Sequence, residues 1–564
     1  MKNYIKIITV FSLVLLMSNS CTDDFERMNT SRDLIVKDLV DVDMMFTRVL
    51  ARSIVVNDEN GLGTVGNWAG ISVSSGNQPF ATGESNGVWN ATYGDYCRNL
   101  SDIVDICSTR ENAAGLVNKK AVARILRVWA FARCTDTYGD IPYFESCLPV
   151  EQAITTPKYD KQKDIYVDLF KELREAVAEI DDSKPLKFKN SDLMYGGNLA
   201  KWKKFGNSLR LRLALRIRYA DASMASEQMA DLTEADLIIA RGDDASIYNI
   251  DDFQEHQNDR YVDLLARKAT AIKLDVPKTF LDILKYNNDP RLHVFADTVN
   301  AWFPQTPGYM DIPYFGYRGK PLLSGQNPQE GYAYSDNTVS RWSDLLWVEI
   351  QELPLYKASE TYFNLAEAAV FGIKSGDAQA YYKKGIELAM AHTKEMYEDA
   401  VPQLPEVVSL FNAGKSDAVI SAALADVIAE KKITQAQIDY FLDNEPTVTL
   451  TGSDEQKLEQ IINQKIIALY PMEHEGWCEH RRTGYPRILV GVENGPLKGH
   501  MPRRMPWPGS EQLINADQYQ IALEGIGGEG KDSRTTTFWW EANPDPFKVH
   551  PGTVETRTTQ WVSQ

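Results

Sequence analysis

Aromatic side chains are concentrated in one stretch of the chain, residues 302–347. Ten of its 46 positions are Trp, Tyr or Phe, about twice the 10% average of the whole chain. They are Trp302, Phe303, Tyr309, Tyr314, Phe315, Tyr317, Tyr332, Tyr334, Trp342 and Trp347. The stretch also holds five Gly and five Pro and lacks helical periodicity. We therefore expect these rings on a long, irregular loop region.

Rings of this kind are suited to binding sugars. A sugar ring has C–H groups on one face, which a flat indole or phenol covers, and hydroxyls at its edge, which Asn, Asp and Arg bind. Each aromatic side chain offers a large contact at low entropic cost. For any single ring, packing in the core is the alternative. By residue type and position, the candidate ligand contacts are Trp302, Tyr309, Tyr314, Tyr317 and Trp342.

Two motifs that are common in enzyme active sites are absent from the sequence. It has no Gly-x-Ser-x-Gly nucleophile elbow, and the Gly-Lys-Ser within residues 412–417 lacks the upstream Gly of a phosphate-binding loop. A glycosidase needs two carboxylates about 5–10 Å apart, but 78 acidic residues make such pairs uninformative in sequence. We predict that the protein is not an enzyme, with a glycan-cleaving enzyme as the minor alternative.

One short segment contains three types of metal ligand. His474 and Cys478 are four residues apart, so they share a face if the segment is helical, and Glu475 lies between them. The segment lacks the His-Glu-x-x-His spacing that places two zinc-binding histidines on one helical turn. We predict no metal site and no cofactor, while the sequence leaves open whether a cation such as Ca²⁺ helps to fold a loop.

The N-terminus carries a targeting signal. Lys2 and Lys6 precede an apolar run at 7–17, which is shorter than the roughly 18 residues needed to cross a bilayer and is typical of a signal peptide. Small polar residues then lead to Cys21, the predicted site of lipid attachment, although Ser18 stands where lipoprotein signals usually have Leu. Two or three acyl chains on such a cysteine give stable anchoring. Ordinary secretory cleavage nearby, or an uncleaved anchor, is the alternative.

The chain divides into a signal peptide (1–20), an acidic tether (21–35) and one large domain (36–564). Removal of the signal peptide takes away two lysines, so the formal charge moves from −18 to −20. Such acidity argues against nucleic acid or anionic lipid as a partner, because both bind basic patches. A content of 43% hydrophobic residues indicates a globular domain with a large core.

The cysteines other than Cys21 are odd in number, so at least one of these five thiols is unpaired. Cys134 and Cys147 flank a loop-like segment and are candidates for a disulfide. Cys97 and Cys107 are expected on one helix, where ten residues span about 15 Å, too far for a disulfide.

Helical periodicity dominates the rest of the chain. Apolar residues spaced by three and four predict helices over 121–134, 162–180, 199–219, 354–371, 378–396, 415–430, 434–443 and 454–469. Residues 207–218 alternate as in a strand, but their Ala, Leu and Arg content favours a helix. We expect a mostly α-helical protein with a scaffold over about 96–230 and 354–480, and ligand loops over about 56–88 and 300–352.

Several segments together resemble the SusD/RagB family of outer-membrane lipoproteins of Bacteroidetes, and its SusD-like branch in particular. The most specific is DLMYGGNLAKWKKFGNSLRLRLALR at 192–216. The others, in family order, are TDTYGDIPYFES (135–146), TPKYDKQKDIYVDLFKEL (156–173), DPRL (289–292), ETYFNLAEAA (360–369), QKIIALYPMEHEGWCEHRRTGYPR (464–487), PRRMPWPGSEQLINADQY (502–519) and FWWE (538–541). The resemblance covers essentially the whole mature chain.

The resemblance implies a scaffold of tetratricopeptide-like helix pairs with ligand loops opposite it. It also implies a surface protein that hands a captured glycan or peptide to a SusC-like TonB-dependent transporter. By the family's organisation the site also draws on the loop before the helix near Trp89, which adds Asn67 and Trp68 as candidates. Trp89 and Tyr93, spaced i and i+4, are expected in the core, as is Trp202 of the 192–216 segment.

We therefore expect a lipid-anchored outer-membrane protein, exposed on the cell surface, that captures an oligosaccharide or polysaccharide without cleaving it. Three alternatives remain at this point. They are capture of a peptide or glycopeptide, as in the RagB branch, cleavage of a glycan, and assembly through helical repeats without a ligand.

Overall fold

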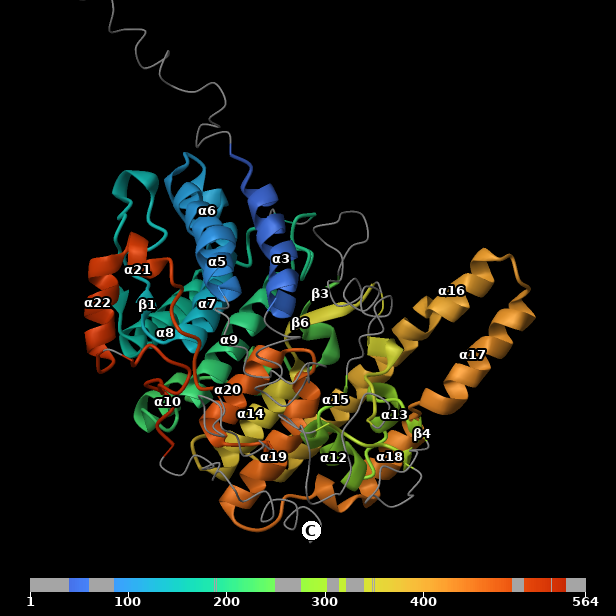
Figure 1. Cartoon of the computed structure of the whole chain (residues 1–564). Helices are drawn as coiled ribbons and strands as arrows, with labels where there is room; N and C mark the ends of the chain where they lie inside the picture. Colours follow the sequence, from blue (N-terminus) through green and yellow to red (C-terminus); the bar gives the residue numbers. More distant parts are fainter. Residues whose placement is uncertain are drawn as a thin grey trace, which may run out of the picture.

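The computed structural model describes residues 40–59, 86–186, 188, 190–248, 275–301, 314–320, 339–346, 348, 350–488, 502–528 and 530–543. The predicted signal peptide and tether, with Cys21, lie outside the described residues. Asn67, Trp68, Trp302 and Tyr309 lie outside them too. The described chain is mostly α-helical, as predicted, with three small antiparallel sheets (Figure 1). No helix among these residues is long and apolar enough to cross a membrane.

The first half of the fold is a row of packed helices, α6 against α7, α7 against α8 and α8 against α9 (Figure 1). Its helices are α3 (Val42–Glu59), α5 (Gly87–Asn90), a π-helix (Ala91–Tyr96), α6 (Cys97–Thr109), α7 (Val117–Tyr138), α8 (Gln162–Glu179), α9 (Leu199–Arg216) and α10 (Ala222–Met229). Arg124 of α7 binds Glu172, Glu175 and Glu179, which follow one face of α8. Helix α7 is followed by Gly139, whose φ of +83° favours glycine.

The second half is built around α14, which packs on α15, α19 and α9. Its helices are α12 (Lys278–Tyr286), α13 (Leu292–Phe295), α14 (Ala358–Val370), α15 (Ala378–Ala400), α16 (Pro405–Asn412), α17 (Asp417–Lys431), α18 (Gln435–Asn444), α19 (Asp454–Leu469), α20 (Glu473–Thr483), α21 (Glu511–Ile514) and α22 (Ala516–Gly525). The helices α16 and α17 project from the body as a hairpin (orange in Figure 1). Capping boxes begin α18 at Thr434 and α19 at Ser453.

The strands form three two-stranded antiparallel sheets: β1 (Ile141–Pro142) with β2 (Tyr159–Asp160), β3 (Ala245–Tyr248) with β6 (Glu352–Tyr356), and β4 (Val299–Ala301) with β5 (Tyr314–Gly316). The predicted helix from 354 was wrong at its start, since residues 352–356 form β6 and the helix begins at Ala358. Pro354 disfavours the helical conformation of the residue before it, and the buried Leu353 and Leu355 join the core.

The other predicted helices are confirmed within a few residues at each end. Residues 207–216 are helical within α9, so the alternating pattern there marks a helix buried on several sides. The consecutive pairs α6–α7, α8–α9 and α14–α15 pack together, while their tetratricopeptide-like character stays a prediction.

All five cysteines in the described part of the chain are free thiols. Cys97 and Cys107 both lie on α6, as predicted. Cys134 and Cys147 do not form the disulfide that the sequence allowed. Burial raises the pKa of the Cys134 thiol to about 12, so it stays protonated at neutral pH.

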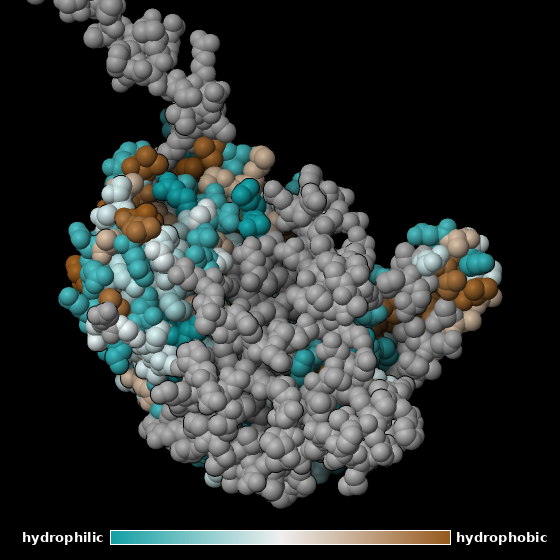
Figure 2. Space-filling model, viewed as in Figure 1, coloured by the Kyte–Doolittle hydropathy of each residue, from teal (hydrophilic) through white to brown (hydrophobic). Residues whose placement is uncertain are grey.

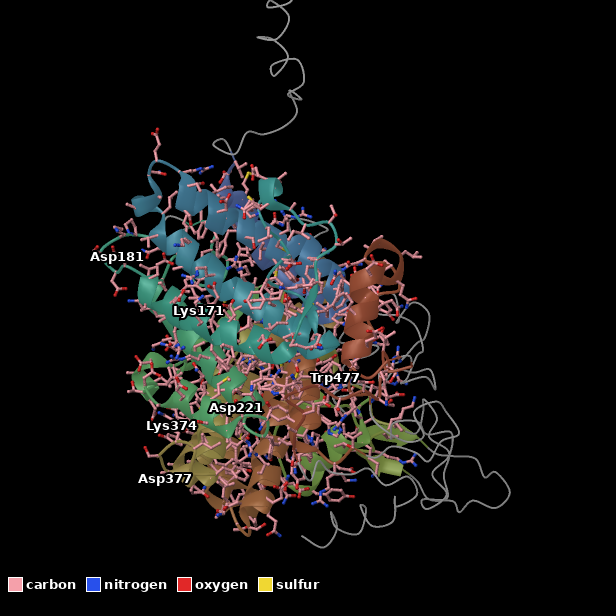
Figure 3. All side chains as sticks on the ribbon, turned by 90° about the vertical axis from the view of Figure 1, so that its left-hand side faces the viewer. Lys171, Asp181, Asp221, Lys374, Asp377 and Trp477 are labelled. Atoms are coloured by element: carbon pink, nitrogen blue, oxygen red, sulfur yellow. The ribbon has the colours of Figure 1, made fainter. Side chains whose placement is uncertain are left out.

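The surface of the described part is polar and charged. In Figure 3, Asp181, Lys374 and Asp377 lie at the edge of the molecule, whereas Trp477 lies inside it and is fully buried. Large exposed hydrophobic residues such as Met44, Val150 and Leu513 are few, and Figure 2 shows the brown apolar areas separated by hydrophilic ones. A surface with dispersed apolar residues is normal for a globular protein.

The core is unusual in holding a network of buried charges. Arg212 of α9 binds Glu360 of α14 through two nitrogens at 2.6 Å each. Glu367 of α14 accepts from Arg218, which follows α9, at 2.6 Å, and from Arg482 of α20. Each of these side chains is at least 90% buried. Because a buried charge is tolerated only with its partners in place, the network fixes α9, α14 and α20 relative to one another.

Replacing Glu367 with Gln tests this network. The change leaves Arg218 and Arg482 as buried cations without their shared carboxylate, so the free energy of unfolding should fall by about 3–5 kcal/mol. Denaturant unfolding followed by circular dichroism measures it. The matched control is Glu387→Gln, whose exposed partner Lys384 lies 3.0 Å away and whose loss should cost less than about 1 kcal/mol. Equal losses in the two variants would contradict the assigned role.

The network also predicts the direction of the pH dependence. Burial by itself raises the pKa of Glu367, but Arg482 and Arg218 outweigh it and hold the pKa below its ordinary value of 4.5. The charged carboxylate is therefore favoured in the folded state. Its contribution to stability is present above pH 4.5 and is lost as the pH falls through the lowered pKa. Glu367→Gln should remove this part of the acid destabilisation.

Candidate ligand-binding site

The described part of the aromatic stretch begins with β5, the second strand of the β4–β5 hairpin. Ala301, the last residue of β4, pairs with Tyr314, the first residue of β5. Tyr314 therefore lies opposite the last residue of β4, at one end of this strand pair. Trp302 and Tyr309 lie outside the described residues, so their predicted contact with ligand stays a prediction.

Tyr317, one residue beyond β5, is half-buried and is held by polar contacts. Its hydroxyl lies 2.7 Å from Nδ1 of His293 on α13. Its carbonyl oxygen accepts a hydrogen bond from Lys285 Nζ at the end of α12, at 3.0 Å. Burial, and then the charge of Lys431, lower the pKa of His293, so this imidazole is neutral at neutral pH. A neutral imidazole keeps one nitrogen as donor and one as acceptor.

These two partners of Tyr317 line an open pocket of about 470 Å³ between α12, α13 and α18. We call it the tyrosine pocket; its walls are Lys285, Asn288, Asp289, Pro290, Leu292, His293, Ala436, Gln437, Tyr440, Phe441 and Glu445. Tyr440 of α18 is 63% exposed, so its ring offers a flat apolar surface to solvent. The volume lies within the range of small-molecule sites.

The polar side of the tyrosine pocket is formed where the chain turns after α12. Asn288 has a φ of +51°, a left-handed conformation that asparagine tolerates better than most residues. Its side-chain amide donates to Glu445 at 3.3 Å, which joins the turn to the end of α18. Behind it, Asp289 binds Arg291, and Arg291 donates to Gln464 of α19. The turn is therefore held rigidly while Asn288 and Glu445 face solvent.

Trp342 lies in the core instead. It is 5% exposed and stacks on Tyr470 with ring centroids 5.1 Å apart, and it contacts the rings of Phe280 and Phe295. Its predicted contact with ligand stays a prediction, but the described position gives it a packing role. Trp89 is buried, as predicted, and the half-buried Tyr93 packs against the same core.

Trp202 is also in the core, as predicted. Its ring is fully buried, and its indole nitrogen donates to Asp192 at 2.8 Å. The arginines of the same helix are bound within the protein, Arg210 by Asp231, Arg212 by Glu360 and Arg216 by Asp136.

His474 and Cys478 share a face of α20, as their spacing predicted, with Nδ1 and Sγ 3.8 Å apart. Burial and the charge of Arg133 lower the pKa of His474 to about 3, and burial raises the pKa of Cys478 to about 12. Arg481 donates to the Cys478 sulfur at 3.1 Å, and Glu475 is bound by Arg216. A protonated thiol among guanidinium groups opposes the binding of a metal cation.

A second group with suitable ligand types is Asp244, Glu352 and His392. Arg241 already neutralises both carboxylates and also binds Glu395 at 2.7 Å. A divalent cation would have to displace this guanidinium. The group is therefore best described as an ion-pair cluster that joins β3, β6 and α15.

Sequence reasoning missed most of the tyrosine pocket. Tyr440 lies within the helix predicted over 434–443 and Glu445 lies two residues beyond it, while no element was predicted at Asn288. The one available signal was the Asn-Asn-Asp-Pro run at 287–290, since such residues favour turns that expose side chains.

Fold and pocket together define a class: an α-helical binding protein with an aromatic, polar-rimmed pocket beside an aromatic hairpin. A family model described as SusD-like, SusD and RagB outer-membrane lipoprotein, matches residues 61–541. The chain belongs to the SusD/RagB family. A comparison with curated proteins finds no match.

Solved structures share this fold. One, described as a chitin-binding protein, has 25% sequence identity and a TM-score of 0.71 over 89% of this chain and 100% of its own. A chitin-binding SusD homologue from Flavobacterium johnsoniae has 24% identity and a TM-score of 0.65 over 89% and 99%. A SusD homologue from Bacteroides fragilis has 22% sequence identity and a TM-score of 0.65 over 89% of this chain and 99% of its own. Consistent with these relatives, the protein is a binding protein and not an enzyme.

Alanine substitutions at Trp342 and at Tyr440 distinguish an aromatic ring that packs in the core from one that is exposed at the pocket. Trp342→Ala removes a ring from a packed core, so the free energy of unfolding should fall by about 3–5 kcal/mol. Tyr440→Ala removes an exposed ring and should change stability by less than about 0.5 kcal/mol. Denaturant unfolding of both variants measures this. A large loss in Tyr440→Ala would show that its ring is needed for packing and would contradict its place on the surface.

Proposed function

We propose that the protein captures an oligosaccharide at the tyrosine pocket and the adjoining β4–β5 hairpin, and delivers it uncleaved to a SusC-like TonB-dependent transporter. The observation that supports this most is the exposed Tyr440 ring in a pocket that is also lined by Asn288 and Glu445, with Tyr317 linked to the same pocket through His293. The pocket thus joins the helical scaffold to the aromatic stretch.

The geometry suits a sugar ring. The face of Tyr440 covers the C–H side of a pyranose, while the carboxylate of Glu445 accepts hydrogen bonds from hydroxyls at its edge. Lys285 supplies an ammonium near the hairpin. The remaining candidates from the sequence, Asn67, Trp68, Trp302, Tyr309, Tyr314 and Tyr317, are proposed as further ligand contacts, whereas Trp342 is assigned to the core.

Chitin oligosaccharides are the first ligands to test, because two of the similar structures are described as chitin-binding. An N-acetylglucosamine unit adds an acetamido group, whose carbonyl accepts a hydrogen bond and whose methyl packs on an aromatic ring. Both kinds of partner are present in the tyrosine pocket.

Titration calorimetry with chitin oligosaccharides, other neutral oligosaccharides and peptides tests the proposal. Tyr440→Ala should weaken binding of the preferred oligosaccharide about tenfold, since a stacked ring contributes about 1–1.5 kcal/mol. The matched control is Tyr248→Ala, because Tyr248 on β3 is 49% exposed and lies outside the pocket.

Three results would overturn this assignment. Binding of peptides alone would exclude a saccharide ligand. Equal affinity in wild type and Tyr440→Ala would move the site elsewhere. Cleavage of the oligosaccharide by the purified protein would show that the protein is a glycan-cleaving enzyme.

The proposed location is the outer face of the outer membrane, with Cys21 as the acylated residue. The family description, outer-membrane lipoprotein, supports the membrane and the type of anchor. An anchored binding protein holds its ligand close to a transporter in the same membrane, which raises the local concentration at the entrance.

Cys21→Ala tests the anchor. The variant should lose metabolic labelling by a fatty acid and should leave the outer-membrane fraction, because acyl chains provide the membrane affinity. Cell fractionation and labelling in the native host measure both. A variant that remains labelled would place the acylated residue elsewhere.

A further inference from the structure

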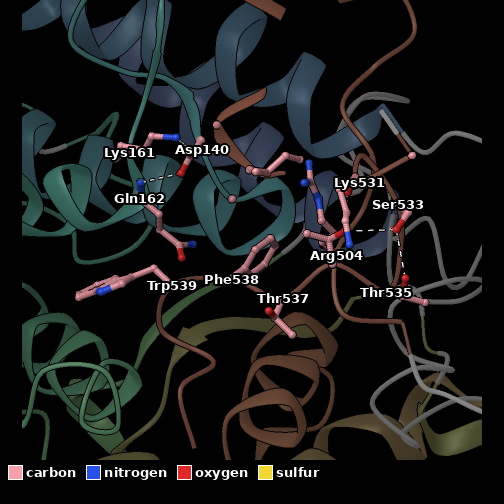
Figure 4. A pocket seen from close by; sticks show the side chains of 15 residues that line it. Asp140, Lys161, Gln162, Arg504, Lys531, Ser533, Thr535, Thr537, Phe538 and Trp539 are labelled. Atoms are coloured by element: carbon pink, nitrogen blue, oxygen red, sulfur yellow. Dashed lines mark hydrogen bonds and ion pairs between the residues drawn. The ribbon is translucent and has the colours of Figure 1, made fainter. Parts of the chain in front are cut away.

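A second pocket lies far from the aromatic stretch in the sequence, where the C-terminal segment crosses the start of α8 (Figure 4). Its volume is about 670 Å³, and it shares no lining residue with the tyrosine pocket. One wall is the beginning of α8, and the other is formed by residues 530–539. We call it the C-terminal pocket.

The C-terminal pocket is positively charged in an acidic protein. Its lining contains Lys161, Arg504 and Lys531 but only one acidic residue, Asp140, whereas the whole chain has a formal charge of −18. Lys161 is paired with Asp140 at 2.7 Å, and Arg504 with Asp532 at 3.1 Å. Lys531 is exposed and its ammonium has no partner among the described residues. One cation is thus available to an anionic ligand.

The same pocket offers an aromatic platform. Trp539 is half-buried, and its ring is supported from the protein side by Tyr166, with centroids 5.9 Å apart. Figure 4 shows Trp539 on the side of the pocket away from Lys531, with Phe538 and Thr537 between them. A supported and partly exposed indole is a surface on which a sugar ring can stack.

Hydrogen-bonding groups complete the pocket. Gln162 is only 2% exposed; its amide nitrogen donates to the Thr135 carbonyl at 2.9 Å, but its Oε1 has no hydrogen-bond partner in the described structure. Figure 4 shows the Gln162 carboxamide reaching from α8 toward the space between Trp539 and Phe538. Thr537 adds an exposed hydroxyl that is also without a partner there. An unpaired buried acceptor is costly, and a donor arriving with a ligand relieves that cost.

We propose that the C-terminal pocket binds a saccharide chain that contains an acidic sugar residue, a hexuronate. One sugar ring of the chain stacks on Trp539, the carboxylate of a neighbouring hexuronate pairs with Lys531, and hydroxyls between them bond Thr537 and, directly or through a water, Gln162. An inorganic anion would satisfy Lys531 but leave Trp539 uncovered, and a neutral sugar would leave Lys531 unpaired. The proposal concerns a site separate from the tyrosine pocket and stands or falls independently of its function.

Two sugars that differ only at C6 provide the test. Titration calorimetry compares α-1,4-linked digalacturonate with α-1,4-linked galactobiose at about 50 mM salt, where screening of charge is moderate. We expect digalacturonate to bind more tightly, and its affinity to fall on addition of salt while that of galactobiose does not. Equal affinities, or no binding of digalacturonate, would overturn the proposal.

The Lys531→Gln variant locates the binding. It should weaken digalacturonate about fivefold, as expected for an ion pair at a pocket rim, and leave galactobiose unchanged. The matched control is Lys171→Gln, since Lys171 is 58% exposed on α8 and about 14 Å along the helix from Gln162. An unchanged digalacturonate affinity in Lys531→Gln, or an equal loss in Lys171→Gln, would overturn the assignment.

Trp539→Phe supplies a second variant, because Phe keeps an aromatic ring against Tyr166 and so preserves the fold. Its smaller ring should weaken both sugars, unlike Lys531→Gln, which should affect only the acidic one. Unchanged affinity in Trp539→Phe would overturn the stacking role. Chitin oligosaccharides are titrated separately, so failure of the C-terminal pocket is distinguishable from failure of the tyrosine pocket.

Discussion

Buried charge pairing is the constraint on which the rest of this structure depends. Glu367 holds α14 to Arg218 and to Arg482 of α20, and none of these groups can leave its partners without stranding a charge in the core. Lys465 of α19 joins the same network through Glu479. One residue earlier, Gln464 receives a hydrogen bond from Arg291. The ion pairs in the middle of the helical scaffold hold α19 in place, and α19 in turn holds the turn at the tyrosine pocket through Gln464 and Arg291.

Regular, amphipathic parts of the fold were predictable from sequence. The helix expected at 162–180 is α8, and the segment at 378–396 lies within α15. Periodicity succeeds there because one face of each helix must meet the core. It failed at 354–356, because these residues belong to the buried strand β6, whose partner, β3, is about a hundred residues away in sequence. Strand pairing of this kind depends on tertiary contacts, so a local sequence pattern does not predict it.

The binding surface was predictable only in outline. Composition marked residues 302–347 as aromatic, yet Tyr317 is half-buried beside a pocket while Trp342 is packed among rings. Residue type cannot separate these cases, because an aromatic side chain suits a core and a ligand equally well. Tyr440 escaped notice for the opposite reason. It is one exposed residue on an ordinary amphipathic helix, and it becomes part of a surface only when α18 meets α12 and α13.

The projecting helical hairpin of α16 and α17 has a consequence for how the molecule opens. At its base, Lys431 binds Asp297, just before β4, and donates to Ser343 at 2.7 Å. Segments that stand away from the core open by local unfolding at a lower free energy than the whole domain. Release of Lys431 removes its contacts with Asp297 and Ser343 next to the β4–β5 hairpin. We therefore expect opening of the projecting helical hairpin to raise amide exchange in β4 as well as in α17.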